Sequence, residues 1–261
     1  MDKRVIKRRV KQFILITTFL FGGLSAYSQS SSFVLDISGM NLQFLNVNRT
    51  LITNGGNNGL AAGSVWRYDN LLTTNGITIY GKMTILSTTN ATITNFDDES
   101  TGLPGRFQPR ITTTGGNGVD GYILYQIEFF EVITNNKVYI SDYYFTAVDI
   151  DGGSTSNNNG EFVEVGGYSS YQVDATSQLT VEQTSERTRF RAIPKDLDGV
   201  TFDNTASFIA RYVFPYTKVT FALGFRGNGA SRENVYSIWY SRRHIQQPHY
   251  DQESTKVALY Y

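Results

Sequence analysis

The sequence contains no cysteine among its 261 residues, so no disulfide can form and stability has to come from a hydrophobic core. Histidine is nearly absent as well, with two copies in the chain. His244 and His249 lie on either side of Pro248 in a polar segment, which is not a zinc-binding spacing. We therefore expect both to be exposed residues of a tail. Without cysteine and without a G-x-S-x-G motif, the sequence offers no recognisable nucleophile–base pair.

Long apolar runs are also missing, with one exception near the N-terminus. Basic residues at positions 3–11 precede an apolar stretch, Phe13–Ala26, and small residues precede Gln29. This order is that of a secretory signal peptide, here residues 1–28. The apolar stretch is shorter than the roughly 20 residues of a membrane-spanning helix. We therefore expect cleavage, export and no membrane span in the mature chain.

Charge of one sign is not in excess over the whole chain, which has 23 basic and 23 acidic residues. Six of the basic residues and one acidic residue lie in the signal region, so the mature chain keeps 17 basic and 22 acidic residues and a net charge of −5. A mildly acidic protein is a poor match for polyanions. We expect no nucleic-acid partner, and a location outside the cell or on its outer surface.

The remaining sequence is typical of an all-β protein. Short runs that alternate apolar and polar residues are separated by Gly, Asn, Ser and Thr turns, and no stretch has a convincing helical period. We predict an antiparallel β-sandwich, of jelly-roll or Ig-like type, over residues 61–240. Residues 29–60 are expected to be a lead-in or edge strands, and residues 241–261 a C-terminal tail or edge strand.

Two long aromatic runs stand out in the middle of the chain. In Tyr122–Val132 the residues Ile123, Tyr125, Ile127 and Phe129 fall on one face, which indicates a strand with that face buried. A second run, Tyr139–Ile150, follows the turn-forming pair Asn135-Asn136. The sequence therefore predicts a central hairpin made of these two runs.

The densest group of acidic residues follows the second run. Asp149 and Asp151 precede Gly152, and Glu161 and Glu164 follow an asparagine-rich loop. Ca²⁺ takes six to eight oxygen ligands from carboxylates, Asn side chains and backbone carbonyls, and this segment offers all three. The spacing is not that of the helix-flanked calcium loop, so an ordinary acidic turn is the alternative. We predict a calcium site formed by Asp149, Asp151, Glu161 and Glu164.

Two other acidic segments could contribute oxygens. Asp97-Asp98-Glu99 is distant in sequence, and no pattern places it near the first group. Asp196-Leu197-Asp198-Gly199 repeats the D-x-D-G pattern of residues 149–152, but no Glu follows it closely, so it is the weaker candidate. Glycosidases also use two carboxylates, but the number of acids in residues 149–164 says nothing about their separation.

Four aromatic residues could stack on sugar rings. Strand aromatics are more often part of a core or an interface than of a ligand platform, so we expect the core position. The four residues are Trp66, Tyr68, Trp239 and Tyr240.

Several pieces of the sequence, taken in order, resemble a known kind of module. The most specific are VWRYDN at residues 65–70, AVDIDG at 147–152 and EFVE at 161–164. Over about residues 63–240 this order is similar to β-sandwich modules of secreted bacterial proteins and large bacterial surface adhesins. The resemblance implies a β-sandwich and a role at or beyond the cell surface.

These observations favour a secreted or cell-surface binding module rather than an enzyme. Its partner is expected to be a glycan or a surface protein, with calcium as a stabilising ion. The alternative from another class is a structural component of an extracellular assembly. A polysaccharide hydrolase is the third possibility.

Overall fold

The computed structural model describes residues 33–152, 159–192, 195–197, 199–227, 229–241 and 248–251. Within these ranges the regular structure is β-strand apart from four short 3-10 helices, η1 (Asn46–Asn48), η2 (Asn57–Gly59), η3 (Glu99–Thr101) and η4 (Asn204–Ala206). The expected signal peptide, residues 1–28, lies outside the described residues. No helix among the described residues is long and apolar enough to cross a membrane.

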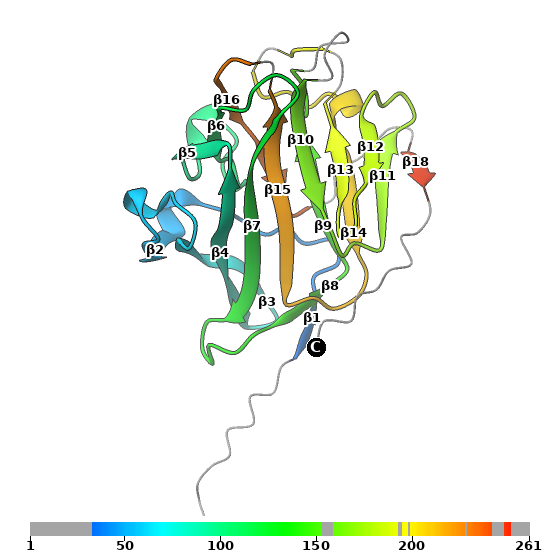
Figure 1. Ribbon diagram of the computed structural model, residues 1–261. Coiled ribbons are helices and arrows are strands. Elements are labelled where there is room, and N and C mark those ends of the chain that lie inside the picture. Colours follow the sequence, from blue (N-terminus) through cyan, green and yellow to red (C-terminus); the bar gives the residue numbers. More distant parts are fainter. Residues whose placement is uncertain are drawn as a thin grey trace, which may run out of the picture. The chain divides into compact units, whose positions relative to one another are not determined.

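Two large antiparallel sheets dominate the described part of the chain (Figure 1). The larger has the order β12 (Thr180–Gln183), β13 (Thr188–Arg191), β10 (Gly160–Val165), β15 (Lys218–Arg226), β7 (Asp120–Glu131), β4 (Ile77–Thr89), β3 (Val65–Thr74) and β2 (Arg49–Thr53). The second has the order β17 (Ser237–Trp239), β9 (Tyr143–Val148), β14 (Phe208–Tyr212), β11 (Ser170–Asp174) and β18 (Pro248–Asp251).

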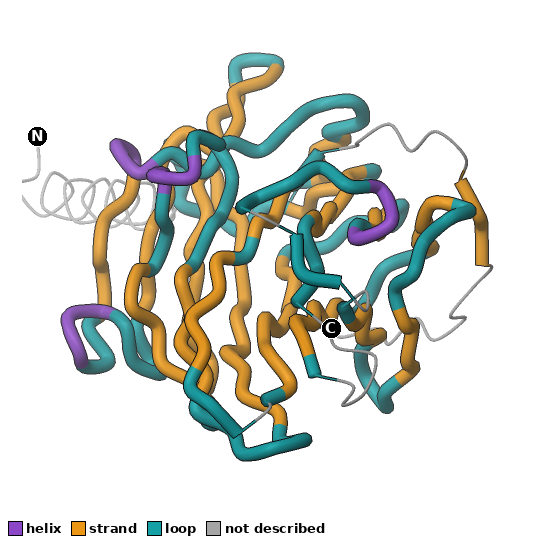
Figure 2. Tube along the Cα trace, turned by 90° about the horizontal axis from the view of Figure 1, so that it is seen from above, coloured by secondary structure: helices purple, strands orange, loops and turns teal. Residues whose placement is uncertain are grey.

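Two smaller groups of strands complete the described structure. One is antiparallel, with the order β16 (Arg232–Val235), β6 (Arg110–Thr113) and β5 (Ala91–Asn95). The other pairs β1 (Val34–Asp36) with β8 (Tyr139–Ser141), and this pair is parallel. Seen from above, the strands occupy facing layers rather than a single sheet (Figure 2). The prediction of an antiparallel β-sandwich is confirmed, with the β1–β8 pair as an exception to its antiparallel pairing.

The core lies between the two large sheets and is rich in aromatic residues. On β7, the predicted inward face of Ile123, Tyr125, Ile127 and Phe129 is fully buried, as the period-two pattern indicates. Rings from different sheets meet there: Phe145 of β9 lies 5.3 Å from Phe221 of β15, centroid to centroid. Aromatic pairs at this separation add to the stabilisation that burial already gives.

The prediction of a central hairpin is correct for the turn but wrong for the pairing of the two strands. A turn does form at Asn135, whose φ is +58°, and Val138 donates a backbone hydrogen bond to Phe129. The chain then leaves β7, because β4 and β15 already occupy both hydrogen-bonding edges of that strand. The second aromatic run continues as β8 and then as β9, which pairs with β14 and β17 in the other large sheet.

The two ends of the described chain also meet the sandwich. Leu42 and Phe44 are buried, and Phe44 packs 5.3 Å from Tyr240 near the end of the described residues. β2 is the last strand of the larger sheet, and β18 is the last strand of the second. His249 belongs to β18, whose side chains lie outside the description, as does the whole of His244.

Candidate functional site

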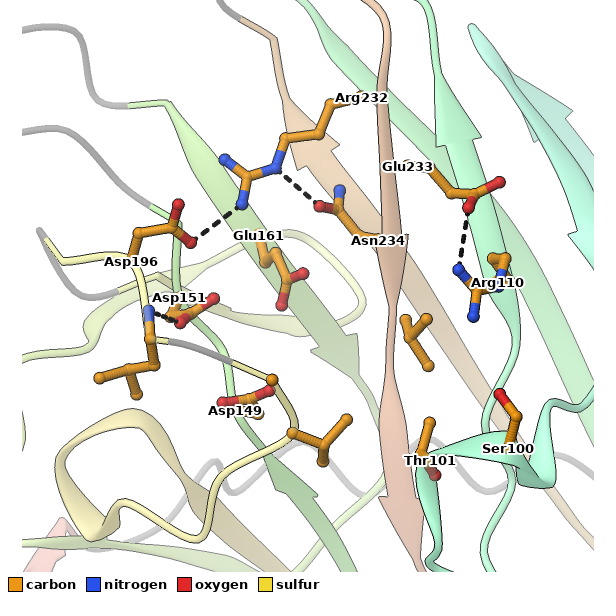
Figure 3. A pocket seen from close by; sticks show the side chains of 14 residues that line it. Ser100, Thr101, Arg110, Asp149, Asp151, Glu161, Asp196, Arg232, Glu233 and Asn234 are labelled. Carbon is orange, nitrogen blue, oxygen red and sulfur yellow. Dashed lines mark hydrogen bonds and ion pairs between the residues drawn. The ribbon is translucent and has the colours of Figure 1, made fainter.

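The candidate site is a cavity of about 450 Å³ at one end of the sandwich. It lies where the segment after β9, the first residues of β10, strand β16 and helix η3 approach one another (Figure 3). Most of its lining is polar or charged. The lining residues are Ser100, Thr101, Arg110, Asp149, Asp151, Glu161, Asp196, Leu197, Gly199, Val200, Arg232, Glu233, Asn234 and Val235.

Asp149 reaches this cavity because β9 ends one residue before it. Its φ is +64°, a left-handed conformation that aspartate tolerates better than β-branched residues do. The turn carries Ile150 into the core, where its backbone N–H donates to the carbonyl of Ala206 at 2.9 Å. Asp151 follows on the cavity side. A strand end and one left-handed residue therefore place two carboxylates at the same wall.

A second segment, residues 195–201, holds these two aspartates in place. The hydroxyl of Thr201 donates to Oδ1 of Asp149 at 2.9 Å, and the backbone N–H of Leu197 donates to Oδ2 of Asp151. The backbone N–H of Gly152 donates to the carbonyl of Lys195 at 2.9 Å. The structure thus brings the repeated D-x-D-G segment against the first copy, although Asp198 itself lies outside the described residues.

Glu161 enters the cavity from the second position of β10. Its backbone N–H donates to the carbonyl of Asp151 at 3.0 Å, which ties the two acidic segments together. Along the strand it shares a face with Val163 and Val165, which belong to the core. Its side chain is only 5% exposed, and its carboxylate points into the cavity between Asp151 and Asn234 (Figure 3).

Glu164 does not join this group. It lies on the opposite face of β10, where it accepts hydrogen bonds from Nε of Arg187 at 3.0 Å and Nε of Arg189 at 2.8 Å. Arg189 is its direct neighbour on β13 and also covers the ring of Phe162. Successive side chains of a strand point to opposite faces, so Glu161 and Glu164, which are three residues apart, lie on opposite faces. The predicted four-carboxylate site is therefore reduced to Asp149, Asp151 and Glu161.

The arginines of the cavity are already paired with acids outside these three. Nη2 of Arg232 lies 3.1 Å from Oδ1 of Asp196, and its Nε donates to Asn234 at 2.9 Å. Arg110 pairs with Glu233 at 2.9 Å and with Asp98 at 2.5 Å. The positive charges are thus distributed around the rim of the site.

The guanidinium of Arg232 also lies close against the backbone of the acidic turn. A Cβ at Gly152, whose φ is +74°, would stand 2.7 Å from Nη2 of Arg232. Glycine therefore has two functions here: it accepts the left-handed conformation and it leaves room for the guanidinium.

Burial raises the pKa of all three carboxyl groups. Desolvation raises the pKa of Asp151 to about 7, and the charge of Asp149 adds to this, against the hydrogen bond from Leu197. Desolvation also raises the pKa of Asp149, against its bonds to Thr201. The pKa of Glu161 is raised well above its usual range by burial first, and then by the charges of Asp151 and Asp149. All three acids would therefore be stabilised by a nearby positive charge.

Calcium binding remains a prediction. Among the described residues, no three Asp, Glu, Cys or His side chains are arranged to hold a metal ion. One oxygen of each aspartate is also engaged by the 195–201 segment. Ca²⁺ would require further oxygens beyond those that the three carboxylates leave open.

The other candidates have mainly structural positions. Asp97 is buried and accepts hydrogen bonds from the hydroxyl of Tyr68 and the backbone N–H of Gln108, both at 2.7 Å. Tyr68 and Tyr240 are core residues, as expected. Trp66 is partly buried, and its ring stacks on Phe96 at 4.9 Å.

Trp239 is also partly buried and lies under the guanidinium of Arg106. Neither this tryptophan nor the other three aromatic candidates line the cavity.

Sequence reasoning missed Arg232, Asn234 and Arg110, which come from strands far from residue 149 in the sequence. The D-x-D-G pattern at residues 196–199, the weaker acidic candidate, was a signal for Asp196 but gave none for these three residues. No local sequence pattern predicts that β16 lies beside the first residues of β10.

No known family model matches the sequence, and no curated protein matches it. Solved structures do match. The N-terminal domain of the adhesin Sgo0707 of Streptococcus gordonii is 11% identical, with a TM-score of 0.50, and the match covers 82% of this chain and 67% of that chain. The glucan binding protein C of Streptococcus mutans is 15% identical, with a TM-score of 0.44, over 72% of this chain and 62% of that chain. The first likeness confirms, at the level of the fold, the resemblance to β-sandwich modules of bacterial surface adhesins.

Proposed function

We propose that this chain is a secreted or surface-held binding module that recognises a glycan or a surface protein through the acidic cavity. The observation that carries the proposal is that three separate charged segments line one cavity. These segments are the residues after β9, residues 195–201, and strand β16. Binding sites typically combine such convergent polar groups with a concave surface of about 300–1,000 Å³. The cavity, at about 450 Å³, has room for one sugar unit or one extended side chain.

The chemistry of the lining supports recognition of hydroxyl, amide and amine groups. Carboxylates accept hydrogen bonds, while Arg232 and Asn234 can donate them. Leu197, Val200 and Val235 supply apolar contacts beside these polar groups. Such a mixture orients a polar ligand and at the same time removes part of its surface from water.

We also propose that the site works by binding without turnover. Glycosidases use two carboxyl groups, one as an acid and the other as a base or nucleophile, so a single unbonded carboxyl group such as that of Glu161 does not suffice. Here Asp149 and Asp151 are each tied by a hydrogen bond to the 195–201 segment, which suits a rigid recognition surface.

The test is a binding screen with the mature chain, residues 29–261, on a glycan array and on a panel of immobilised surface proteins. The variants Asp149→Asn and Asp151→Asn change the cavity, and Glu131→Gln at the far end of β7 is the control. The proposal requires a ligand that the control binds normally and that the cavity variants bind more weakly. Equal binding by all variants, or release of reducing sugar from a polysaccharide in the same samples, would contradict it.

One observation favours the structural alternative. β2 is the last strand of the larger sheet, so no described strand pairs with its outer edge, and Ile52 on it is 44% exposed. Light scattering on the mature chain tests this second candidate. Concentration-dependent multimers that disappear with Ile52→Lys would support assembly through this edge, and a monomer at all concentrations would reject it.

A further inference from the structure

Within the part of the chain that the structure describes, the three inward carboxylates of the cavity form no ion pair of their own. Arg232 is bonded to Asp196 and Asn234, and Arg110 is bonded to Glu233 and Asp98. None of the ion pairs among the described residues includes Asp149, Asp151 or Glu161. Buried carboxylates are normally paired, because an isolated buried charge is costly.

Glu161 supplies an independent indication that something from outside completes the site. It is 5% exposed, and neither a side-chain hydrogen bond nor an ion pair reaches its carboxylate within the described structure. The backbone N–H of Asp151 faces this carboxyl group and lowers its pKa. The carboxylate points into the cavity (Figure 3). A buried acid aimed at an open cavity is positioned to accept a donor from a ligand.

The number of available acceptors fits an organic cation better than calcium. Asp149 and Asp151 each give one oxygen to the 195–201 segment, and one oxygen of Glu161 faces the backbone N–H of Asp151. This leaves about three carboxylate oxygens uncommitted, whereas Ca²⁺ takes six to eight oxygen ligands. A protonated primary amine has three donors, one for each carboxylate. The cavity is also much larger than an ion requires, so the amine can arrive on a longer group.

We propose that Asp149, Asp151 and Glu161 form the recognition site for a protonated primary amine of the ligand, either a lysine side chain of a protein or the amino group of an unacetylated amino sugar. This rests on the proposed function, since it names the chemical group that the cavity binds. Leu197 and Val235 border the cavity, where they can contact the alkyl chain or the sugar ring that carries the amine.

Binding of the amine is coupled to release of protons. The groups that act on the three acids are Asp196 from the 195–201 segment, Arg232 from β16, Asp203 beside Asp149, and Tyr236 beside Glu161. Because the carboxyl groups hold protons at a pH where free carboxylates would not, a cation has to displace them. The affinity for a lysine amine, which stays protonated over this range, should therefore rise between pH 6 and pH 8.

The experiment titrates the mature chain with Nα-acetyl-lysine methylamide and with glucosamine, followed by backbone NMR shifts. The neutral counterparts are Nα,Nε-diacetyl-lysine methylamide and N-acetylglucosamine. We expect binding of one charged probe at least about tenfold tighter than its neutral counterpart, and about a tenfold loss with Glu161→Gln. The shifts should centre on residues 149–152 and 161. Which charged probe binds more tightly separates the protein source from the glycan source.

Several results would overturn the inference. These are equal binding of charged and neutral probes, unchanged affinity in Glu161→Gln, and a rise in melting temperature with CaCl₂ while neither amine binds. Failure of the proposed function is recognised separately by the array. One possible result is an array ligand whose binding is lost in Asp151→Asn but is unaffected when the amines of the ligand are acetylated. This result would support the proposed binding function and contradict the proposal that the cavity recognises an amine. Amine binding without any array ligand supports the cation site and rejects the wider function.

Discussion

Glu161 and Glu164 lie three residues apart on β10 and face opposite sides of the same sheet. Glu161 points into the acidic cavity without a side-chain partner among the described residues, whereas Glu164 is held between Arg187 and Arg189 on the outer face. Glu164 thus has a structural position, whereas Glu161 has the position that we propose for ligand recognition. Their substitution should separate binding from stability.

Glu164→Gln should lower stability and leave binding intact. Arg189 has an exposed side-chain fraction of 13%, so loss of the Glu164 charge leaves a partly buried cation with Asp120 as its remaining acidic partner. We expect a loss of about 2–3 kcal/mol in the free energy of unfolding, measured by urea denaturation at pH 7. Glu161→Gln should cost less, because burial already favours the neutral form of that side chain. The reverse order of the two losses would contradict the assignment of the two faces.

The stability of the protein should fall as the pH rises through neutrality. The pKa of Asp151 is about 7 in the folded protein and about 3.9 in an unfolded chain, so the folded state binds the extra proton between these values. The corresponding stability is fully present below pH 4 and is lost as the pH rises through 7. Water at the cavity mouth reduces the effect to about 1–2 kcal/mol. Melting temperatures from pH 5 to pH 8 should change less in Asp151→Asn than in the parent chain.

Arg232→Gln should bind a primary amine more tightly. The guanidinium lowers the pKa of both Asp151 and Glu161, which means that it contributes positive charge at the site where the amine would bind. Its removal should strengthen amine binding about threefold to tenfold at pH 8, as measured by the NMR titration. Arg211→Gln, at an arginine paired with Asp142 near the other end of β9, is the matched control. Weaker binding in Arg232→Gln would indicate that Arg232 contacts the ligand directly.

Tyr68→Phe should destabilise the core, and more so at high pH. The Tyr68 hydroxyl donates to the buried carboxyl of Asp97 at 2.7 Å. Burial raises the pKa of Asp97 to about 7 even though this bond lowers it. Its loss leaves an unsatisfied buried acceptor, which costs about 1–3 kcal/mol. Ionised Asp97 depends on the donor most, so the loss should be larger at pH 8 than at pH 5 in chemical denaturation. A pH-independent loss would show that the hydroxyl matters only for packing.

Much of the fold could be predicted from local sequence patterns. The alternation of Ile123, Tyr125, Ile127 and Phe129 identified the inner face of β7, because side chains of a strand point to alternate faces whatever its neighbours are. The pairing partner could not be found in this way. Adjacent strands in sequence usually pair, but β4 and β15 occupy the two edges of β7, so the chain crosses to the other sheet after Asn135.

The candidate site could likewise be predicted from the sequence only in part. By itself, the sequence determined that two aspartates follow a strand just before Gly152 and that two glutamates lie on the next strand, and it predicted export through an N-terminal signal. Only the tertiary structure decided that Glu161 joins the aspartates while Glu164 pairs with arginines, and that Asp196 and Arg232 complete the wall. The physical reason is that period two assigns faces within one strand, whereas burial, desolvation and charge pairing depend on segments far apart in the chain.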